Sequence, residues 1–238
     1  IKLQRLDEAA RVLDLARESG FDKEEFLELR QLLNTRSEST LVSENGQEAS
    51  GPSEEKLDHL MNLYNQDQFM KAIEQAQEII KHHPQAFMAW SILGAAKQGL
   101  GILAEASRAF KKVTELNPSY PDGFNNLGVA LEGEGKLEEA IKAYNQAIAL
   151  NPDYAEAYYN MGNALECQLN IKKAIEAYQK AVFIKPDYCD AHFNMGLTFK
   201  AQGKLENAID AYKKVISIKP NYPEAVSYTH LTLPTSYA

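Results

Sequence analysis

Residues 121–154 read PDGFNNLGVALEGEGKLEEAIKAYNQAIALNPDY, and residues 155–188 read AEAYYNMGNALECQLNIKKAIEAYQKAVFIKPDY. The two stretches have equal length and place Gly, Ala, Tyr and Pro at the same positions. The spacing extends to both sides, because five prolines follow one another at intervals of 34 residues: Pro84, Pro118, Pro152, Pro186 and Pro220. A fixed period of this length is typical of a solenoid built from stacked repeats.

Aligned on these prolines, the chain contains four complete units: 87–120, 121–154, 155–188 and 189–222. Three positions of each unit carry one kind of residue. The eighth is glycine (Gly94, Gly128, Gly162, Gly196), the twentieth is alanine (Ala106, Ala140, Ala174, Ala208) and the twenty-fourth is aromatic (Phe110, Tyr144, Tyr178, Tyr212). Glycine within a helix costs about 1 kcal/mol relative to alanine. Its return at the same position therefore predicts a close contact between two helices.

Apolar residues recur at helical spacing in both halves of a unit. Positions four, seven, eight and eleven fall on one face of a first helix, and Ala140, Tyr144 and Ala147 form the corresponding stripe of a second. Gly101, Gly135 and Gly203 stand at the turn between the helices, where a left-handed residue is expected. The third unit has Leu169 there, and we expect the adjacent Asn170 to supply the cap.

These residues resemble the tetratricopeptide repeat, whose pattern is a large ring, Leu, Gly and Tyr, followed by Ala, an aromatic residue, Ala and Pro. The resemblance covers 87–222, with mild departures at Lys97, Val113 and Val215. It implies an all-α fold, a right-handed superhelical solenoid of antiparallel helix pairs.

The segments on either side of residues 87–222 depart from the repeat pattern. Residues 53–86 keep the register at Ala72 and Pro84, and we interpret them as a degenerate capping repeat. Residues 1–34 predict an N-terminal helical pair broken at Gly20, which resembles a further degenerate repeat, and the polar stretch 35–52 predicts a flexible linker.

At the other end, residues 223–225 begin a further, truncated repeat, whereas 226–238 begins VSYTHLTLPT, which resembles the translation of a sequencing-library adapter. We exclude this segment from fold reasoning. Because the chain starts on Ile1, we expect it to be a fragment. Because the repeat register ends at residue 225, we expect the natural protein to continue beyond it and the last helix of 189–222 to lack its neighbour here.

In a solenoid of this kind the first helices line a concave groove, which we expect to bind an extended peptide. Asparagine occupies position six in three units (Asn126, Asn160, Asn194), with Asn125 and Asn163 beside it. Each carboxamide offers two donors and an acceptor to a peptide backbone. Tyr159 and Phe193 could add apolar contacts. The alternative interpretation is that these asparagines are tolerated solvated residues.

The arrangement resembles the repeat arm of protein O-GlcNAc transferases, in which asparagines at this position hold substrate peptides, and bacterial repeat proteins that continue into sulfotransferase or glycosyltransferase domains. It does not resemble the carboxylate clamp of chaperone-binding repeats, which needs Lys or Arg at position two, because that position holds Met88, Asp122, Glu156 and Asp190. Glu132 and Glu166 at position twelve would extend this acidic rim. We therefore expect a neutral or basic partner rather than an acidic one.

The net charge and the motifs that are absent argue against several other functions. The net charge of -8 disfavours a nucleic-acid or membrane partner. No phosphate-binding loop, nucleophile elbow or metal-binding motif occurs, so we expect no catalytic residue, metal or cofactor in this chain. Adjacent His82 and His83 do not face each other on a helix, and two unpaired cysteines, Cys167 and Cys189, favour a cytoplasmic location.

The sequence thus predicts a non-enzymatic scaffold that binds a protein or peptide in the groove of a helical solenoid. The alternative is the substrate-recruiting arm of a larger, truncated enzyme, a glycosyltransferase or a sulfotransferase. The gene sequence beyond residue 225 would distinguish the two.

Overall fold

The computed structural model describes residues 51–223, 225 and 227–228. The predicted N-terminal helical pair, most of the predicted linker and most of 226–238 lie outside the described residues. The described part belongs to one compact unit of the chain, which begins at Gly51.

Residues 51–223 contain ten helices and no strand. The helices are α3 (Glu54–Asn65), α4 (Phe69–His82), α5 (Phe87–Gly99), α6 (Leu103–Leu116), α7 (Pro121–Gly133), α8 (Leu137–Leu150), α9 (Ala155–Cys167), α10 (Ile171–Ile184), α11 (Cys189–Ala201) and α12 (Leu205–Ile218). Each predicted unit becomes one hairpin, and α3 with α4 form a further hairpin ahead of them. The prediction of an all-α solenoid is confirmed.

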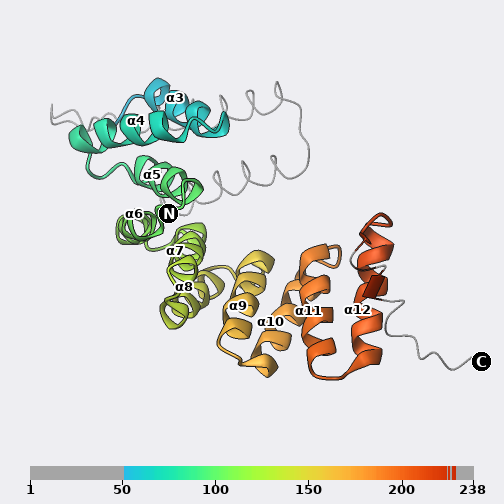
Figure 1. The fold of residues 1–238 in the computed structure, drawn as a ribbon. Coiled ribbons are helices and arrows are strands. Elements are labelled where there is room, and N and C mark those ends of the chain that lie inside the picture. The colour runs from blue at the N-terminus through green and yellow to red at the C-terminus, as the bar shows by residue number, and fades with distance from the viewer. Residues whose placement is uncertain (1–50, 224, 226, 229–238) are drawn as a thin grey trace, which may run out of the picture. The chain divides into compact units, whose positions relative to one another are not determined.

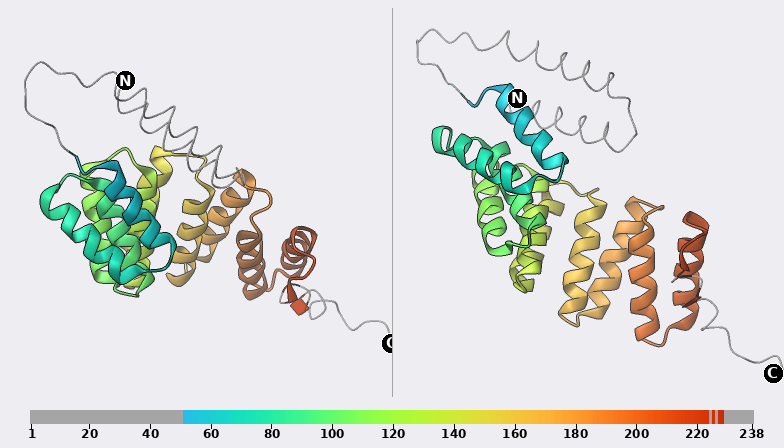
Figure 2. Two further views of the ribbon diagram at one scale, coloured as in Figure 1. Left: turned by 90° about the horizontal axis from the view of Figure 1, so that it is seen from above. Right: turned by 45° about the horizontal axis from the view of Figure 1, so that its top comes forward.

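The hairpins stack in chain order (Figures 1 and 2). The two helices of each hairpin contact each other, and the second helix contacts the first helix of the next hairpin. A first helix also reaches the following first helix, as α7 does with α9. Each hairpin therefore buries its apolar face only together with its neighbours, as expected of a repeat array.

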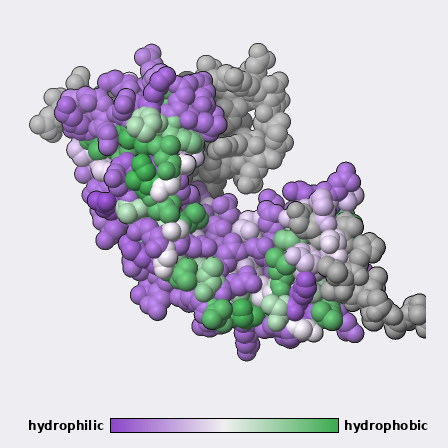
Figure 3. Space-filling model, viewed as in Figure 1, coloured by the Kyte–Doolittle hydropathy of each residue, from purple (hydrophilic) through white to green (hydrophobic). Residues whose placement is uncertain are grey.

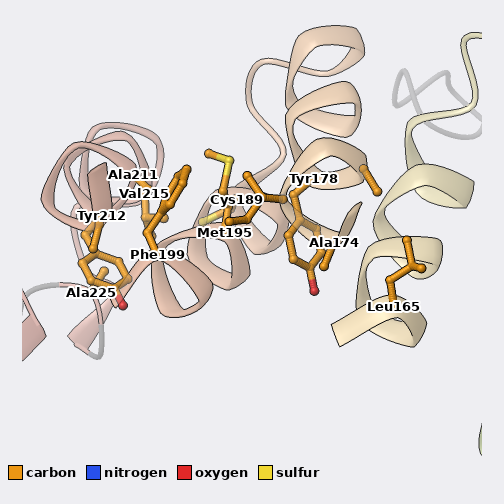
Figure 4. Packing of buried hydrophobic residues seen from close by; sticks show 13 residues of the cluster. Leu165, Ala174, Tyr178, Cys189, Met195, Phe199, Ala211, Tyr212, Val215 and Ala225 are labelled. Carbon is orange, nitrogen blue, oxygen red and sulfur yellow. The ribbon is translucent and has the colours of Figure 1, made fainter. Parts of the chain in front are cut away.

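The apolar core runs through the array between the hairpins (Figure 4). One cluster extends from Leu165 on α9 through Tyr178 and Phe199 to Tyr212 on α12. The aromatic residue at position twenty-four is fully buried in all four complete units, as are the alanines at position twenty. On the face shown in Figure 3, the apolar residues form separate patches among hydrophilic ones.

The glycine at position eight lies directly against this aromatic ring. A Cβ atom on Gly128 would lie 2.4 Å from Cε1 of Tyr144, and one on Gly162 would lie 2.5 Å from Cε1 of Tyr178. Gly94 and Gly196 have the same relation to the rings at position twenty-four of their own units. The predicted close contact is therefore between two positions of the motif, one on each helix of the hairpin.

The turn between the helices is left-handed in each described hairpin. Its residue has φ of 73° at Gly101, 77° at Gly135 and 74° at Gly203, and the non-glycine residues Asp67 and Leu169 adopt 56° and 60° at the same position. The prediction that Asn170 supplies this cap is wrong, since Asn170 has φ of -87° and precedes α10. The stacking of the array overrides the side-chain preference of Leu169.

We predict that Leu169→Gly stabilises the protein by up to about 1 kcal/mol, because a left-handed conformation costs an L-residue roughly 1–2 kcal/mol and glycine's extra chain entropy returns only part of that. Little burial is lost, since Leu169 is 82% exposed. The matched control is Leu100→Gly, at a residue with φ of -89° just before an equivalent turn, which we expect to destabilise. Urea denaturation measures the free energy of unfolding of both variants. A Leu169→Gly protein less stable than the wild type would contradict the claim that the left-handed backbone at Leu169 is strained.

The last helix has a neighbour, contrary to expectation. Residues 223, 225 and 227–228 are helical, and Ala225 is fully buried against α12. The ring of Tyr228 stacks on Tyr212 with centroids 5.4 Å apart. The segment that resembles an adapter thus supplies a side chain that packs on Tyr212 in the middle of α12.

Lys97, a departure from the repeat pattern, and His192, the ring of the fourth unit, both have local partners. Lys97, in a slot that other units fill with an apolar residue, is 8% exposed and forms an ion pair with Glu105. A hydrogen bond from Lys97 lowers the pKa of Glu105. His192, in the ring position, places Nε2 at 3.0 Å from the carbonyl of Pro186 and so donates as Trp90 Nε1 does to Pro84.

Candidate functional site

The predicted binding residues lie on the first helices α7, α9 and α11. We term their asparagines Asn126, Asn160, Asn163 and Asn194 the asparagine face, and Asn125 lies beneath it. All except Asn125 are half-buried. Their register comes from the stacking, because α7 contacts α9 and side chains of α9 and α11 are hydrogen-bonded to each other. The structure therefore brings the predicted asparagines of successive repeats together.

One asparagine pair links α7 to α9. Asn160 Nδ2 donates to Asn125 Oδ1 at 3.1 Å, and Asn125 is 1% exposed. Asn125 thus supports the face from within and does not line it as predicted. The amide of Asn160 keeps its second hydrogen and its oxygen for another partner.

A second link joins α9 to α11. Asn194 Nδ2 lies 3.0 Å from Asn163 Oδ1 and 3.2 Å from the hydroxyl oxygen of Tyr159, so both of its amide hydrogens have acceptors. The Asn194 oxygen remains as a hydrogen-bond acceptor. Asn126, at the other end of the series, makes no hydrogen bond through its side chain in the described part of the chain.

Buried tyrosine hydroxyls anchor the glutamates at position twelve. Tyr144 donates to Glu132 Oε2 at 2.7 Å, and Tyr178 donates to Glu166 Oε2 at 3.0 Å or to Asn163 Oδ1 at 2.8 Å. The prediction that Glu132 and Glu166 form part of an open acidic rim is therefore wrong. Both are half-buried partners of core hydroxyls, and sequence reasoning missed these pairs.

The ionisation of these groups reflects their burial. Burial raises the pKa of Glu132, and the hydrogen bond from Tyr144 offsets part of this effect. Burial and the nearby carboxylates raise the pKa values of Tyr144 and Tyr178 far above the ordinary tyrosine value. Both hydroxyls stay protonated and act as donors at any physiological pH.

The first and fourth complete units lack this pair. In the first unit, Gln98 and Phe110 occupy the two positions, and Phe110 has no hydroxyl to donate. In the fourth, Lys200 replaces the glutamate, and the buried hydroxyl of Tyr212 has no hydrogen-bond partner in the described part of the structure. The phenol–carboxylate pairs are thus confined to the two middle units.

The predicted aromatic contacts, Tyr159 and Phe193, are half-buried and packed against other rings. The Tyr159 ring lies 5.0 Å from that of Tyr188 and 6.1 Å from that of Tyr178. Phe193 lies 5.1 Å from Tyr222 in the same arrangement. These ring contacts brace the first helices α9 and α11.

The acidic residues at position two lie at the start of the first helices. Asp122 is half-buried and hydrogen-bonds the hydroxyl of Tyr154, whereas Glu156 and Asp190 are exposed. Burial, together with the carboxylates of Glu156 and Asp190, raises the pKa of Tyr188. Three carboxylates therefore give this end of the first helices a negative potential.

No cluster of three metal-ligating side chains occurs among the described residues. Cys167 is exposed and Cys189 is buried, and both are free thiols. None of the described helices is long and apolar enough to cross a membrane. His82 instead lies 2.9 Å from Glu78 on the same helix.

Comparison with known proteins finds family models of helical repeats that match parts of this array. Two family models described as "Tetratricopeptide repeat" match residues 189–222 and 109–142, and a third described as "TPR repeat" matches 133–168 and 170–203. The array is a solenoid of tetratricopeptide repeats. No curated protein matches the chain.

Several solved structures share this fold. MamA is 28% identical with a TM-score of 0.64, over 69% of this chain and 96% of that one. YrrB, described as a TPR protein with an unusual peptide-binding site, is 20% identical with a TM-score of 0.62, over 77% and 94%. A thermophilic TPR protein of Thermus thermophilus is 22% identical with a TM-score of 0.58, over 75% and 97%.

Proposed function

We propose that this chain is a protein-interaction scaffold that binds an extended peptide along the asparagine face. The observation that carries the proposal is the linked series of carboxamides across three consecutive first helices. Hydrogen bonds between repeats hold Asn160 and Asn194 in place before any ligand binds. Such preorganisation reduces the side-chain entropy lost on binding.

The donors and acceptors of the asparagine face that are left over from the hydrogen bonds between repeats match those of a peptide backbone. The oxygen of Asn194 accepts from a peptide N–H, whereas Asn126 and Asn160 keep both donor and acceptor capacity. Main-chain recognition of this kind is independent of the ligand's side chains. The similar protein YrrB is itself described as having a peptide-binding site, which agrees with a peptide ligand for this fold.

The carboxylates at position two favour a neutral or basic peptide. Glu156 and Asp190 are exposed beside the asparagine face and attract lysine or arginine side chains. A substrate-recruiting arm of a larger enzyme would use the same contacts. The function assigned to these residues is therefore binding, and any chemistry would belong to another domain.

The expected result of replacing Asn126, Asn160 and Asn194 together by alanine is a loss of peptide affinity of about ten-fold or more, since hydrogen bonds contribute about 1 kcal/mol each. The probe is a short fluorescein-labelled peptide of Ser, Val and Lys, with an Asp-containing counterpart expected to bind more weakly. Fluorescence anisotropy measures both affinities.

Stability serves as the control for this experiment. Removing Asn160 leaves the buried Asn125 without its donor, so the triple variant is expected to melt slightly earlier. The single variant Asn126→Ala has no such partner and should keep the wild-type melting temperature while weakening binding. Asn207→Ala, at an exposed position on α12, should change neither property. Wild-type affinity in the triple variant would refute the proposed site.

A further inference from the structure

Helix α10 begins with the opposite charge from its counterparts in the other complete repeats. The first turns of α6, α8 and α12 carry glutamate, whereas the first turn of α10 carries none. Lys172 and Lys173 stand there instead. Positive charge at a helix N-terminus is unfavourable, because the helix dipole is positive at that end. The stability of α10 alone therefore does not explain these lysines.

The same helix carries an unusual aromatic residue near its end. Phe183 is 81% exposed at position twenty-nine, which is Glu115, Ala149 or Ser217 in the other complete units. Lys180 lies one turn before it, with Nζ 5.9 Å from the centre of the Phe183 ring. Lys173, Lys180 and Phe183 share one side of the helix by their spacing.

These side chains border a hollow of about 650 Å³ between α8 and α10. Its floor is formed by Tyr158, Met161 and Leu165 of α9, and its walls include Ile141 of α8 and Phe183 of α10. The volume is in the range of pockets that bury a ligand group, and the floor is largely apolar.

The hollow and the asparagine face lie on opposite sides of α9. Tyr158, Met161 and Leu165 form one stripe of the helix, with spacings of three and four residues. Because successive residues turn by about 100°, Asn160 and Asn163 fall on the other side. A ligand in the hollow would therefore leave the asparagine face accessible.

We propose that this hollow is a second docking surface, for an acidic protein segment that inserts one bulky apolar side chain beside Phe183. The apolar floor accommodates the anchor, and Lys173 and Lys180 at the rim face carboxylates that flank it. Glu176, between the two lysines, leaves the rim with a net positive charge. This preference is opposite to that of the asparagine face, so the two surfaces select different partners.

The test uses the full chain and a short fluorescein-labelled peptide of Asp and Glu around one central phenylalanine. We expect saturable binding that weakens with salt, and at least ten-fold weaker binding when the peptide's phenylalanine becomes alanine or its acids become lysines. Phe183→Ala, and Lys173→Glu with Lys180→Glu, should each weaken binding at least ten-fold. The charge-reversed variant should gain affinity for the lysine peptide.

Two controls separate this surface from the rest of the array. Lys214→Glu alters the same position as Lys180 in the next repeat and should bind normally, as should the triple asparagine variant. The side chains replaced on α10 and at Lys214 are exposed, so melting of these variants should not fall. No saturable binding, or unchanged binding by the α10 variants, would overturn the proposal. Self-association that Phe183→Ala abolishes would also overturn it, by assigning the hollow to a second copy.

Discussion

Replacing Gly128 by alanine is expected to lower the free energy of unfolding by about 1–3 kcal/mol, the usual cost of overpacking a core. The added methyl group would lie 2.4 Å from the ring of Tyr144. That ring cannot move aside cheaply, because it is fully buried and its hydroxyl is bonded to Glu132. Helix propensity alone predicts the opposite sign, a gain of about 1 kcal/mol. Urea denaturation followed by circular dichroism measures the change.

The matched control lies in the same helix. A methyl group on Gly133 would meet only the side chain of Leu103, whose Cδ1 would lie at 2.8 Å and is the end of a half-buried, flexible side chain. Gly133→Ala is therefore expected to be neutral or slightly stabilising. If the Gly128→Ala protein unfolded at the same urea concentration as the Gly133→Ala protein, the close contact would not limit stability.

The sequence predicts this contact only in part. The recurrence of glycine at position eight and of an aromatic ring at position twenty-four indicates two packed helices, because both patterns have the period of the repeat. That Gly128 meets the ring of Tyr144 itself requires the crossing geometry of the hairpin. Periodicity fixes which face of a helix is buried, but it does not pair individual residues across two helices.

The polar side chains of the candidate site were harder to predict. From the sequence, Glu132 and Glu166 are interpreted as solvent-exposed residues, because carboxylates are mostly exposed in proteins. Their phenol partners lie twelve residues away on the other helix, in positions that apolar patterning assigns to the core. The only sequence signal is that glutamate at position twelve is absent from the first unit, where Phe110 has no hydroxyl. In the fourth unit, however, Lys200 replaces the glutamate although Tyr212 keeps its hydroxyl, which weakens this signal.

Asn125 illustrates the same limit. Sequence reasoning placed it in the binding groove, because asparagine in a first helix reads as polar and exposed. The stacking of α9 on α7 buries it instead and gives it Asn160 as a partner. Burial of a polar residue by the next repeat depends on the rise and rotation between hairpins, which a single sequence does not encode in any local pattern.

The phenol–carboxylate pairs provide the second large effect. Tyr144→Phe is expected to destabilise the protein by about 1–3 kcal/mol, because Glu132 stays half-buried without its donor. Tyr212→Phe removes a hydroxyl at the same position of the repeat. That hydroxyl is buried without a hydrogen-bond partner in the described residues, so its loss should be neutral or stabilising. Thermal and urea unfolding of the two variants measure the contrast.

A double variant tests the cause of this contrast. Tyr144→Phe combined with Glu132→Gln recreates the pair of residues that the first unit has naturally in Gln98 and Phe110. A neutral amide costs less to bury than a carboxylate, so the double variant should recover part of the stability lost in Tyr144→Phe. Equal losses in Tyr144→Phe and Tyr212→Phe, or no recovery in the double variant, would mean that ring packing rather than the hydroxyl–carboxylate bond stabilises the middle repeats.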